Sequence, residues 1–402
     1  MTQYKISTIK SVRGFRAHGV ACGIKASKMK DLALIVSDTP ASVAALFTKN
    51  RVPSPSVTFS RNVLKKTKSL RAIIINSGNA NAATGSKGYK DCRLITSRTA
   101  ELLGVSYKEV LIASTGIIGV PLPTQTIING IPKLISGLEK NGWGAASDAI
   151  LTTDMVSKTA QTHILLGGKK VLIAGIAKGS GMIHPNMATM LGFIVTDSNI
   201  NSTALNVALR KAVDPTFNAI SVDAEPSTND CVIAMANGQA GNAPLRQGSA
   251  NYQKFVSALE EVCRSLAWKV VKDGEGATKF LTVCAFGGKS SVEAKKVAER
   301  VARSNLVKTA MFGQDPNWGR IIAAMGNAGV SIKIDKIEIR LNGILLVTKG
   351  QPVPTPKAEL TTVMKKKNIR IELFLNQGNF QAEVYTCDLS YDYIKINAEY
   401  TT

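Results

Sequence analysis

The chain has 402 residues, of which 45% are hydrophobic, and a formal net charge of +22. A chain of this length is too long to fold around a single hydrophobic core of ordinary size, so we expect two or three packed units. The chain contains no run of about 18 apolar residues, and its first residues lack the apolar block of a signal peptide. We therefore expect a cytoplasmic protein that does not enter a membrane.

The positive charge is concentrated in the first half of the chain. Residues 1–188 carry 25 basic and 8 acidic side chains, whereas residues 189–402 carry 25 and 20. Such an excess can steer acidic ligands or attract nucleic acid. The densest cluster, Lys365-Lys366-Lys367, has no interleaved aromatic residues that would stack on bases. We expect this cluster to face solvent between a helix and a strand, and we expect no nucleic-acid partner.

The cysteines are scattered along the chain. They form no C-x-x-C pair and have no companion histidines at zinc-finger spacing. We therefore expect neither a disulfide framework nor a metal site, and we interpret these residues as small buried filler. The six cysteines are Cys22, Cys92, Cys231, Cys263, Cys284 and Cys387.

Strands and helices alternate in the first part of the chain. Short apolar runs at residues 33–38, 71–78 and 109–114 predict buried strands, because polar turn residues bound each of them. The segment "YKDCRLITSRTAELLG" has helical spacing and ends at Gly104, a good stop signal. The segment "NSTALNVALRKAV" begins with Asn and Ser, which cap helices. This pattern indicates an α/β protein.

Turn pairs predict several hairpins. They lie at Gly167-Gly168, at Asn342-Gly343 and around Gln377-Gly378, so the sheets should be mixed or largely antiparallel. The sequence pattern changes near residue 285. A helix expected at 291–304 begins a smaller unit that is rich in hairpins. We therefore divide the chain into units of residues 1–285 and 286–402.

Several loops contain more Gly, Asn, Ser and Thr than a turn requires. They are "NSGNANAATG" (76–85), "STGIIG" (114–119) and "GQDPNWGR" (313–320). Each is weak evidence alone, and none has the spacing of a dinucleotide or P-loop fingerprint. The chain has only three histidines and no G-x-S-x-G elbow. We therefore do not expect a Ser-His-Asp enzyme.

The segment "KGSGMIHPNMATMLGFIVTD" (178–197) places one threonine, Thr189, at the start of a strand-like run. Threonine suits a pleated strand, so this position needs no catalytic explanation. Thr189 could also be a nucleophile. If the peptide bond before it were cut, its free α-amino group could take the hydroxyl proton. The residues alone leave both interpretations open.

Six motifs together resemble the glutamate N-acetyltransferase (ornithine acetyltransferase) family of arginine biosynthesis. They are "KGSGMIHPNMATML", "STGIIG", "LTTD", "STND", "DPNWGR" and the C-terminal "TCDLSYDYIKINAEYTT". The likeness runs from "GFRAHGVACGIK" at residue 14 to the end of the chain. It implies a four-layer αββα sandwich with a smaller C-terminal α+β domain. It also implies self-cleavage at Ala188-Thr189, which would give an α chain (1–188) and a β chain (189–402).

The resemblance assigns a role to each matching residue. Thr189 would be the cleavage residue and the nucleophile that carries the acetyl group. Thr115 and Gly116 would form the oxyanion hole, since a hydroxyl and a backbone N–H can both donate to a developing negative charge. The substrate-binding residues would be Thr152, Lys178, Thr189, Glu275, Asn397 and Thr402.

The implied activity transfers an acetyl group from N2-acetyl-L-ornithine to L-glutamate through an acetyl-threonine intermediate. The resemblance implies no metal or redox cofactor. Some members of the family also use acetyl-CoA as a donor, and the sequence does not decide between the two forms. The implied assembly is an α2β2 heterotetramer of the two fragments.

Two alternatives come from other classes of protein. A self-processed aminopeptidase or amidase would share the fold and the nucleophile but pass the acyl group to water. A nucleic-acid-binding protein is supported only by the net charge. The sequence also departs from the common family pattern, with Ala224-Glu225-Pro226 where Gly-Asp-Thr is frequent and Met155 where threonine is common. We expect neither departure to touch an assigned site.

Overall fold

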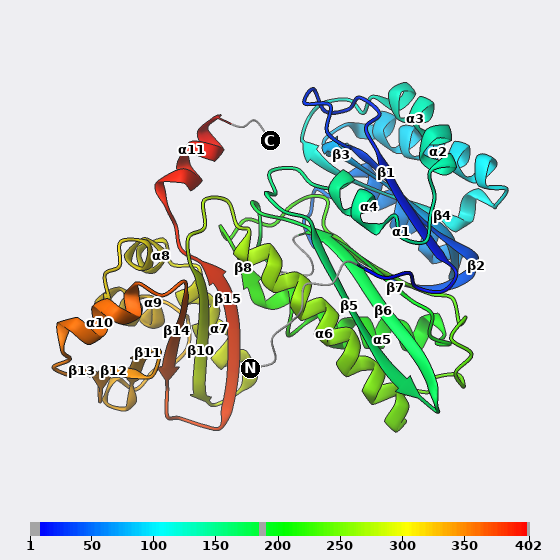
Figure 1. The fold of residues 1–402 in the computed structure, drawn as a ribbon. Helices are drawn as coiled ribbons and strands as arrows, with labels where there is room; N and C mark the ends of the chain where they lie inside the picture. Colours follow the sequence, from blue (N-terminus) through cyan, green and yellow to red (C-terminus); the bar gives the residue numbers. More distant parts are fainter. Residues whose placement is uncertain (1–8, 185–189, 400–402) are drawn as a thin grey trace.

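Two mixed β-sheets organise the parts of the chain that the computed structural model describes, which are residues 9–184 and 190–399 (Figure 1). The predicted residues Ala188, Thr189 and Thr402 lie outside these ranges. Within the described residues, no helix is long and apolar enough to cross a membrane. The described elements confirm the predicted mixed α/β class.

The first sheet has the strand order β4-β3-β2-β9-β7-β6-β5, and β1 pairs with β2. Its strands are β1 (Phe15–Val20), β2 (Leu32–Phe47), β3 (Ser69–Asn79), β4 (Val110–Ile117), β5 (Lys158–Leu166), β6 (Lys169–Lys178), β7 (Leu191–Thr196) and β9 (Cys231–Ala236). The long strand β2 belongs to both halves of the sheet. Its first half pairs with β1 and β3 and its second half with β9, and its pairing with β3 shifts register between Val36 and Ala41.

The two halves of this sheet face each other across a shared apolar core. Successive strand residues point to opposite faces, so Ile73 and Ile75 of β3 join Phe193 and Val195 of β7 in the inner cluster. The short helix α4 (Trp143–Ala149) also contributes Trp143 to this core. The sheet therefore forms the two inner layers of a sandwich.

Helices cover both outer faces of the sandwich. On the side of β3 and β4 lie α1 (Pro55–Lys66), α2 (Gly85–Leu103) and α3 (Thr124–Ser136), packed on Leu34, Ile74 and Ile112. On the side of β6 and β7 lie α5 (Ser202–Val213) and α6 (Ala250–Lys272), packed on Ile173 and Ile194. This arrangement confirms the predicted αββα layers.

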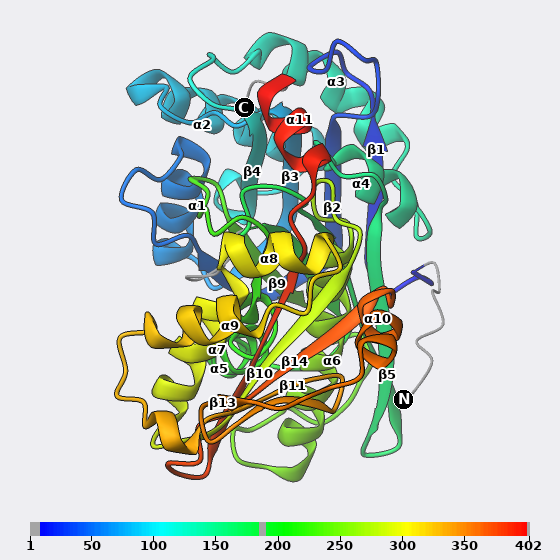
Figure 2. The same cartoon turned by 90° about the vertical axis from the view of Figure 1, so that its left-hand side faces the viewer.

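The second sheet has the order β13-β12-β11-β14-β10-β15-β8 and a core of its own (Figure 2). Its strands are β8 (Ile220–Ser221), β10 (Phe280–Gly288), β11 (Glu338–Leu341), β12 (Ile344–Thr348), β13 (Gln351–Pro352), β14 (Asn368–Phe374) and β15 (Phe380–Cys387). The accompanying helices are α7 (Ser291–Ala302), α8 (Asn305–Phe312), α9 (Trp318–Gly326) and α10 (Lys357–Met364). Because β10 begins at Phe280, the expected boundary near residue 285 falls inside a strand.

One predicted hairpin is wrong. The turns at Gly167-Gly168 and Asn342-Gly343 do join paired strands, β5 with β6 and β11 with β12. The turn around Gln377-Gly378 joins β14 to β15, but these strands do not pair with each other. The strand β10 lies between them, parallel to β14 and antiparallel to β15. A turn sequence predicts that the chain reverses, and it does not predict which strand fills the space alongside.

Local signals fix several element ends as expected. Gly104 ends α2 in the left-handed conformation, with φ +65°, and the Asn201 side chain caps α5 by accepting from Ala204 N.

The Lys365-Lys366-Lys367 cluster is exposed between α10 and β14. The cysteines are free thiols and are buried, except for the half-buried Cys22. The last described helix, α11 (Tyr391–Glu399), buries no residue of its own.

Candidate active site

A cavity of about 150 Å³ collects the assigned residues that the structure describes. They come from five separate places: the end of β4, the loop before β5, the end of β6, the loop after α6, and α11. The residues are Thr115, Gly116, Thr152, Lys178, Glu275 and Asn397. Their gathering is what a shared site requires. The roles assigned to them remain predictions.

The end of β4 places Thr115 and Gly116 at the cavity. Gly116 pairs with Gly78 of the parallel strand β3, and its φ is +130°. A Cβ at this position would collide with the backbone of Gly78 and would lie 2.5 Å from Asn79 N. Only glycine fits here, because the conformation is left-handed and the neighbouring strand is too close.

Asn229 fixes the position of this strand end. Its side-chain amide donates to Ser114 O at 2.8 Å and to Ala80 O at 2.6 Å. Asn229 is buried and also lines the cavity. The sequence analysis gave it no role, although it lies in the "STND" motif that carried the resemblance. The Thr115 hydroxyl and the Gly116 backbone are thereby held in one place, which an oxyanion hole requires.

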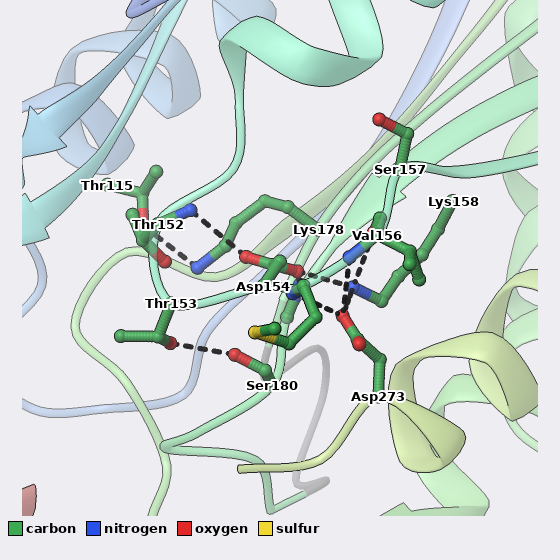
Figure 3. A network of polar contacts seen from close by, with 12 residues as sticks. Thr115, Thr152, Thr153, Asp154, Val156, Ser157, Lys158, Lys178, Ser180 and Asp273 are labelled. Atoms are coloured by element: carbon green, nitrogen blue, oxygen red, sulfur yellow. Dashed lines mark hydrogen bonds and ion pairs between the residues drawn. The ribbon is translucent and has the colours of Figure 1, made fainter. Parts of the chain in front are cut away.

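Lys178, at the end of β6, reaches the same point from another strand. Its ammonium donates to Thr115 Oγ1 at 3.2 Å, and the residue is 9% exposed (Figure 3). Burial lowers the pKa of Lys178. The carboxylate of Asp154 opposes this shift most strongly, followed by those of Asp230 and Glu275. The arrangement presents a cation that can bind a carboxylate, and it leaves the Thr115 hydroxyl free to donate its own proton.

The loop before β5 supplies Thr152 and Thr153. Thr152 N donates to Asp154 Oδ2 at 3.0 Å, and the Thr153 hydroxyl shares a 2.7 Å hydrogen bond with Ser180 (Figure 3). Ser180 follows β6 closely, so this bond joins the loop to the chain segment after Lys178. By itself the sequence "TTD" is typical of a cap or turn. The structure shows that its aspartate is a buried acceptor.

Glu275 and Asn397 bring the C-terminal helix to the cavity. The Asn397 amide donates to Glu275 Oε2 at 2.8 Å and to Tyr393 O at 3.0 Å. Glu275 N donates to Ser180 O at 3.1 Å. A Cβ on Gly181 would lie within 2.4 Å of the Glu275 carboxylate, so a larger residue here would displace that side chain. The described part of the tail is therefore tied to the core, as a binding role for this end of the chain requires.

The chain on both sides of the predicted cleavage bond also lines the cavity, through Ile183 and Met190. Asp223 accepts from Met182 N at 2.6 Å and from Ile183 N at 2.9 Å. On the other side, Met190 O accepts from Cys231 N at 3.0 Å. Both flanks are thus held by backbone hydrogen bonds. The bond Ala188-Thr189 lies outside the described residues, and its cleavage remains a prediction.

No histidine of the described chain lines this cavity. Burial, with a contribution from Arg303, lowers the pKa of His184 to about 4, so this imidazole is neutral near pH 7. Among the described residues, no group of His, Cys, Asp or Glu could hold a metal ion. The cavity offers hydroxyl, amide and ammonium donors together with carboxylates.

Carboxylates that the sequence analysis did not assign also face the cavity. Burial raises the pKa of Asp230 well above its ordinary value, and the nearby Lys178 opposes this shift. Glu225 lines the cavity too. The Ala224-Glu225-Pro226 departure changes no assigned residue, but it places one unassigned side chain at the cavity. Ala224 has a φ of +68°, a conformation in which the glycine of the common family pattern is unstrained.

Comparison with known proteins gives one family. The model of the ArgJ family matches residues 16–402. The arginine biosynthesis bifunctional protein ArgJ of Geobacter sulfurreducens is 48% identical over 395 residues, covering 98% of this chain and all of that one. The protein of the same name from Bacillus anthracis is 45% identical over 402 residues, covering 100% of this chain and 98% of that one.

A solved structure agrees with these relatives. The crystal structure of the arginine biosynthesis bifunctional protein argJ from Bacillus halodurans is 39% identical to the matched part of this chain. It superposes with a TM-score of 0.50 and covers 52% of this chain and 98% of its own. The relatives and this structure therefore agree on one family.

Proposed function

Because the chain belongs to the ArgJ family, we propose that it transfers an acetyl group from N2-acetyl-L-ornithine to L-glutamate in arginine biosynthesis. The observation that carries this proposal is the cavity itself. Thr115, Gly116 and Lys178 meet there beside both flanks of the predicted cleavage bond. This set supplies donors for a developing oxyanion and a cation for a carboxylate, which acyl transfer between two amino acids requires.

The first half of the reaction forms an acetyl-enzyme. The freed α-amino group of Thr189 takes the proton of its own hydroxyl as the hydroxyl oxygen attacks the acetamide carbonyl of acetylornithine. The negative oxygen that develops accepts hydrogen bonds from the Thr115 hydroxyl and the Gly116 N–H. The C–N bond then breaks, the ornithine nitrogen takes the proton from the Thr189 ammonium, and the acetyl group remains as an ester on Thr189.

The second half repeats the chemistry in reverse. The neutral α-amine of glutamate attacks the ester carbonyl, and the same two donors bind the oxyanion. The Thr189 α-amino group takes the proton that the glutamate nitrogen loses and passes it to the Thr189 oxygen as the C–O bond breaks, and acetylglutamate leaves. Both substrates are amino acids, so one carboxylate site serves both. We assign this carboxylate to Lys178, and we assign recognition of amine and amide groups to Glu275 and Asn397.

We extend the proposal to acetyl-CoA as a second donor, with no metal or redox cofactor. The relatives are named bifunctional proteins, and the strong positive charge of residues 1–188 would help to attract a polyanionic donor. Glutamate acetylation should be assayed with each donor alone. Activity with acetylornithine but not with acetyl-CoA would limit the protein to one donor.

We propose that the working form is a cytoplasmic α2β2 heterotetramer of fragments 1–188 and 189–402. Denaturing gels should show two fragments, and the second should begin Thr-Met-Leu. Light scattering on the native protein should give the mass of two α and two β fragments. A single uncut chain with full activity would rule out the processed form.

Steady-state kinetics test the proposed activity directly. A covalent acetyl-enzyme predicts ping-pong behaviour, which gives parallel double-reciprocal lines when one substrate is varied at fixed levels of the other. Peptide amides assayed alongside separate this function from that of an aminopeptidase or amidase. Hydrolysis of the amides without transfer to glutamate would favour the hydrolase.

A further inference from the structure

A buried charge network lies behind the cavity wall. Lys158 Nζ is 2.6 Å from both Asp154 Oδ1 and Asp273 Oδ2 (Figure 3). The Lys158 and Asp154 side chains are fully buried, and that of Asp273 is 9% exposed. Burying these charged groups costs free energy because they lose their water. Their pairing offsets much of this cost, but a buried ion pair adds little to the free energy of unfolding. The proposed acetyl transfer assigns the network no role.

The Asp154 carboxylate joins two segments that shape the cavity. Its Oδ1 accepts from Gly179 N at 2.6 Å, directly after Lys178, and its Oδ2 accepts from Thr152 N at 3.0 Å. One carboxylate therefore sets the position of the Lys178 backbone and of the Thr152 loop. Asp273 holds a different part of the network, because it accepts from Met155 N at 3.0 Å as well as from Lys158.

Asp154 also faces Lys178 electrostatically. Burial favours the neutral form of Asp154, but the positive charges of Lys178 and Lys158 outweigh it and lower the pKa of Asp154 to about 2. In return, Asp154 is the strongest of the charges that favour the protonated form of Lys178. Lys158 acts in the opposite direction on Lys178, and Asp273 is the second carboxylate that pairs with Lys158.

We propose that Asp154 is a positioning residue for the transfer reaction. It holds Lys178 and the Thr152 backbone in the arrangement that binds the substrate carboxylate, and Lys158 and Asp273 hold Asp154 in turn. This inference rests on the proposed function, because it assigns Lys178 to substrate binding. It gives Asp154 no contact with the reacting atoms. Its effect should therefore pass through Lys178.

Matched substitutions in the full-length, processed protein separate this role from a purely structural one. Asp154→Asn and Asp273→Asn each remove one buried carboxylate charge from Lys158 and keep the side-chain shape. Only Asp154→Asn removes a charge that faces Lys178. We expect Asp154→Asn to raise KM for acetylornithine by about tenfold or more, equivalent to ~1.4 kcal/mol. Asp273→Asn should lower Tm while changing KM much less.

The pH profile of kcat/KM is the decisive readout. Lys178 binds a carboxylate only when protonated, so activity falls as pH rises through its pKa. The charged groups acting on it are Asp154, Lys158, Asp230 and Glu275, and Lys178 in turn acts on Lys25. Loss of the Asp154 charge lowers the pKa of Lys178, so the alkaline fall in activity should move to lower pH. With Asp273→Asn this fall should stay at its wild-type position.

A second variant should shift the alkaline fall in activity in the opposite direction. Lys158→Met removes the cation that disfavours protonated Lys178, so the alkaline fall should move to higher pH. This measurement also serves if Asp154→Asn fails to fold or to process itself. The half-exposed ion pair between Lys30 and Asp148 supplies a surface control. Asp148→Asn removes this ion pair but keeps an oxygen that can accept from Ser157, so it should leave the pH profile unchanged.

Three results would overturn the inference. They are an unmoved alkaline fall in both Asp154→Asn and Lys158→Met, an equal shift in Asp273→Asn, or a full further loss when Asp154→Asn is added to Lys178→Met. Each presupposes a wild-type protein that transfers acetyl groups. If wild-type protein failed to transfer them, the proposed function would fail instead.

Discussion

The cavity has two walls that are ordered by different means. The oxyanion wall consists of Thr115, Gly116 and Asn229. Neutral hydrogen bonds and backbone geometry hold its strand end, and its one charged contact is the bond from Lys178 to Thr115. The charged wall is formed by Lys178, whose position depends on Asp154 and the other ionised groups buried behind it. The backbone of the oxyanion wall should therefore depend little on pH and should not tolerate added atoms. The charged wall should tolerate changes of shape better than changes of charge.

The largest effect is expected on the oxyanion wall. Thr115→Ala removes one of two donors to the developing charge, and loss of such a donor typically lowers turnover ~100 to 1,000-fold. We expect kcat to fall by that factor while KM for acetylornithine changes little, as measured by initial rates on fully processed protein. Thr115→Ser keeps the hydroxyl and should retain most activity. A change in KM alone would make Thr115 a binding residue.

A smaller effect, of a different kind, is expected on the charged wall. Lys178→Met removes the cation assigned to the substrate carboxylate, and a hydrogen bond to a charged group contributes roughly 1.5 to 3 kcal/mol. We expect KM to rise by about 10 to 100-fold and kcat to change less. The alkaline fall in kcat/KM should disappear, because the titrating ammonium is gone. An unchanged KM would leave Lys178 without this role.

Gly116→Ala tests whether backbone geometry orders the oxyanion wall. The added methyl would collide with Gly78 in a left-handed conformation, so we expect a loss of roughly 2 kcal/mol or more in the free energy of unfolding. Gly119→Ala is the matched control. Gly119 has a φ of +82° but open space where the added methyl would lie, so its cost should be about half as large. Equal losses would remove the close approach to Gly78 as the reason.

The smallest effect is expected for the neutral hydrogen bond between Thr153 and Ser180, close to Lys178. Thr153→Val keeps the side-chain shape and removes the 2.7 Å hydrogen bond to Ser180. Such a bond contributes about 1 kcal/mol, so denaturant unfolding should show a loss of that size and KM a change of a few-fold. A loss like that expected for Gly116→Ala would mean that this bond, too, fixes the cavity.

Local sequence signals predicted local structure well. Gly104 and Asn201 mark helix ends that depend on the conformation of one residue, and Gly167-Gly168 marks a turn between adjacent strands. The false hairpin around Gln377-Gly378 shows the limit of such signals. The strand β10, which separates β14 from β15, comes about ninety residues earlier, and no local pattern specifies a partner at that distance.

For the site, the sequence indicated which residues lie together, and their roles remain predictions. The resemblance placed Thr115, Lys178 and Glu275 in one site, and the cavity brings them together. Only the three-dimensional contacts assigned roles to Asn229 and Asp154. Both lie inside recognised motifs, "STND" and "LTTD". Each holds another residue in place, and the residue type alone does not indicate such a role. Supporting roles of this kind depend on tertiary contacts, which cannot be predicted from the sequence motif alone.

Mass spectrometry can show whether Thr189 carries the acetyl group after ornithine has left and before glutamate binds. Processed protein should be incubated with acetylornithine alone, quenched rapidly in acid and analysed as intact fragments. We expect one added acetyl group on the fragment that begins at Thr189, located at the hydroxyl of this residue, and we expect glutamate to remove it. An unmodified fragment, together with intersecting double-reciprocal lines, would contradict the account and indicate direct transfer between bound substrates.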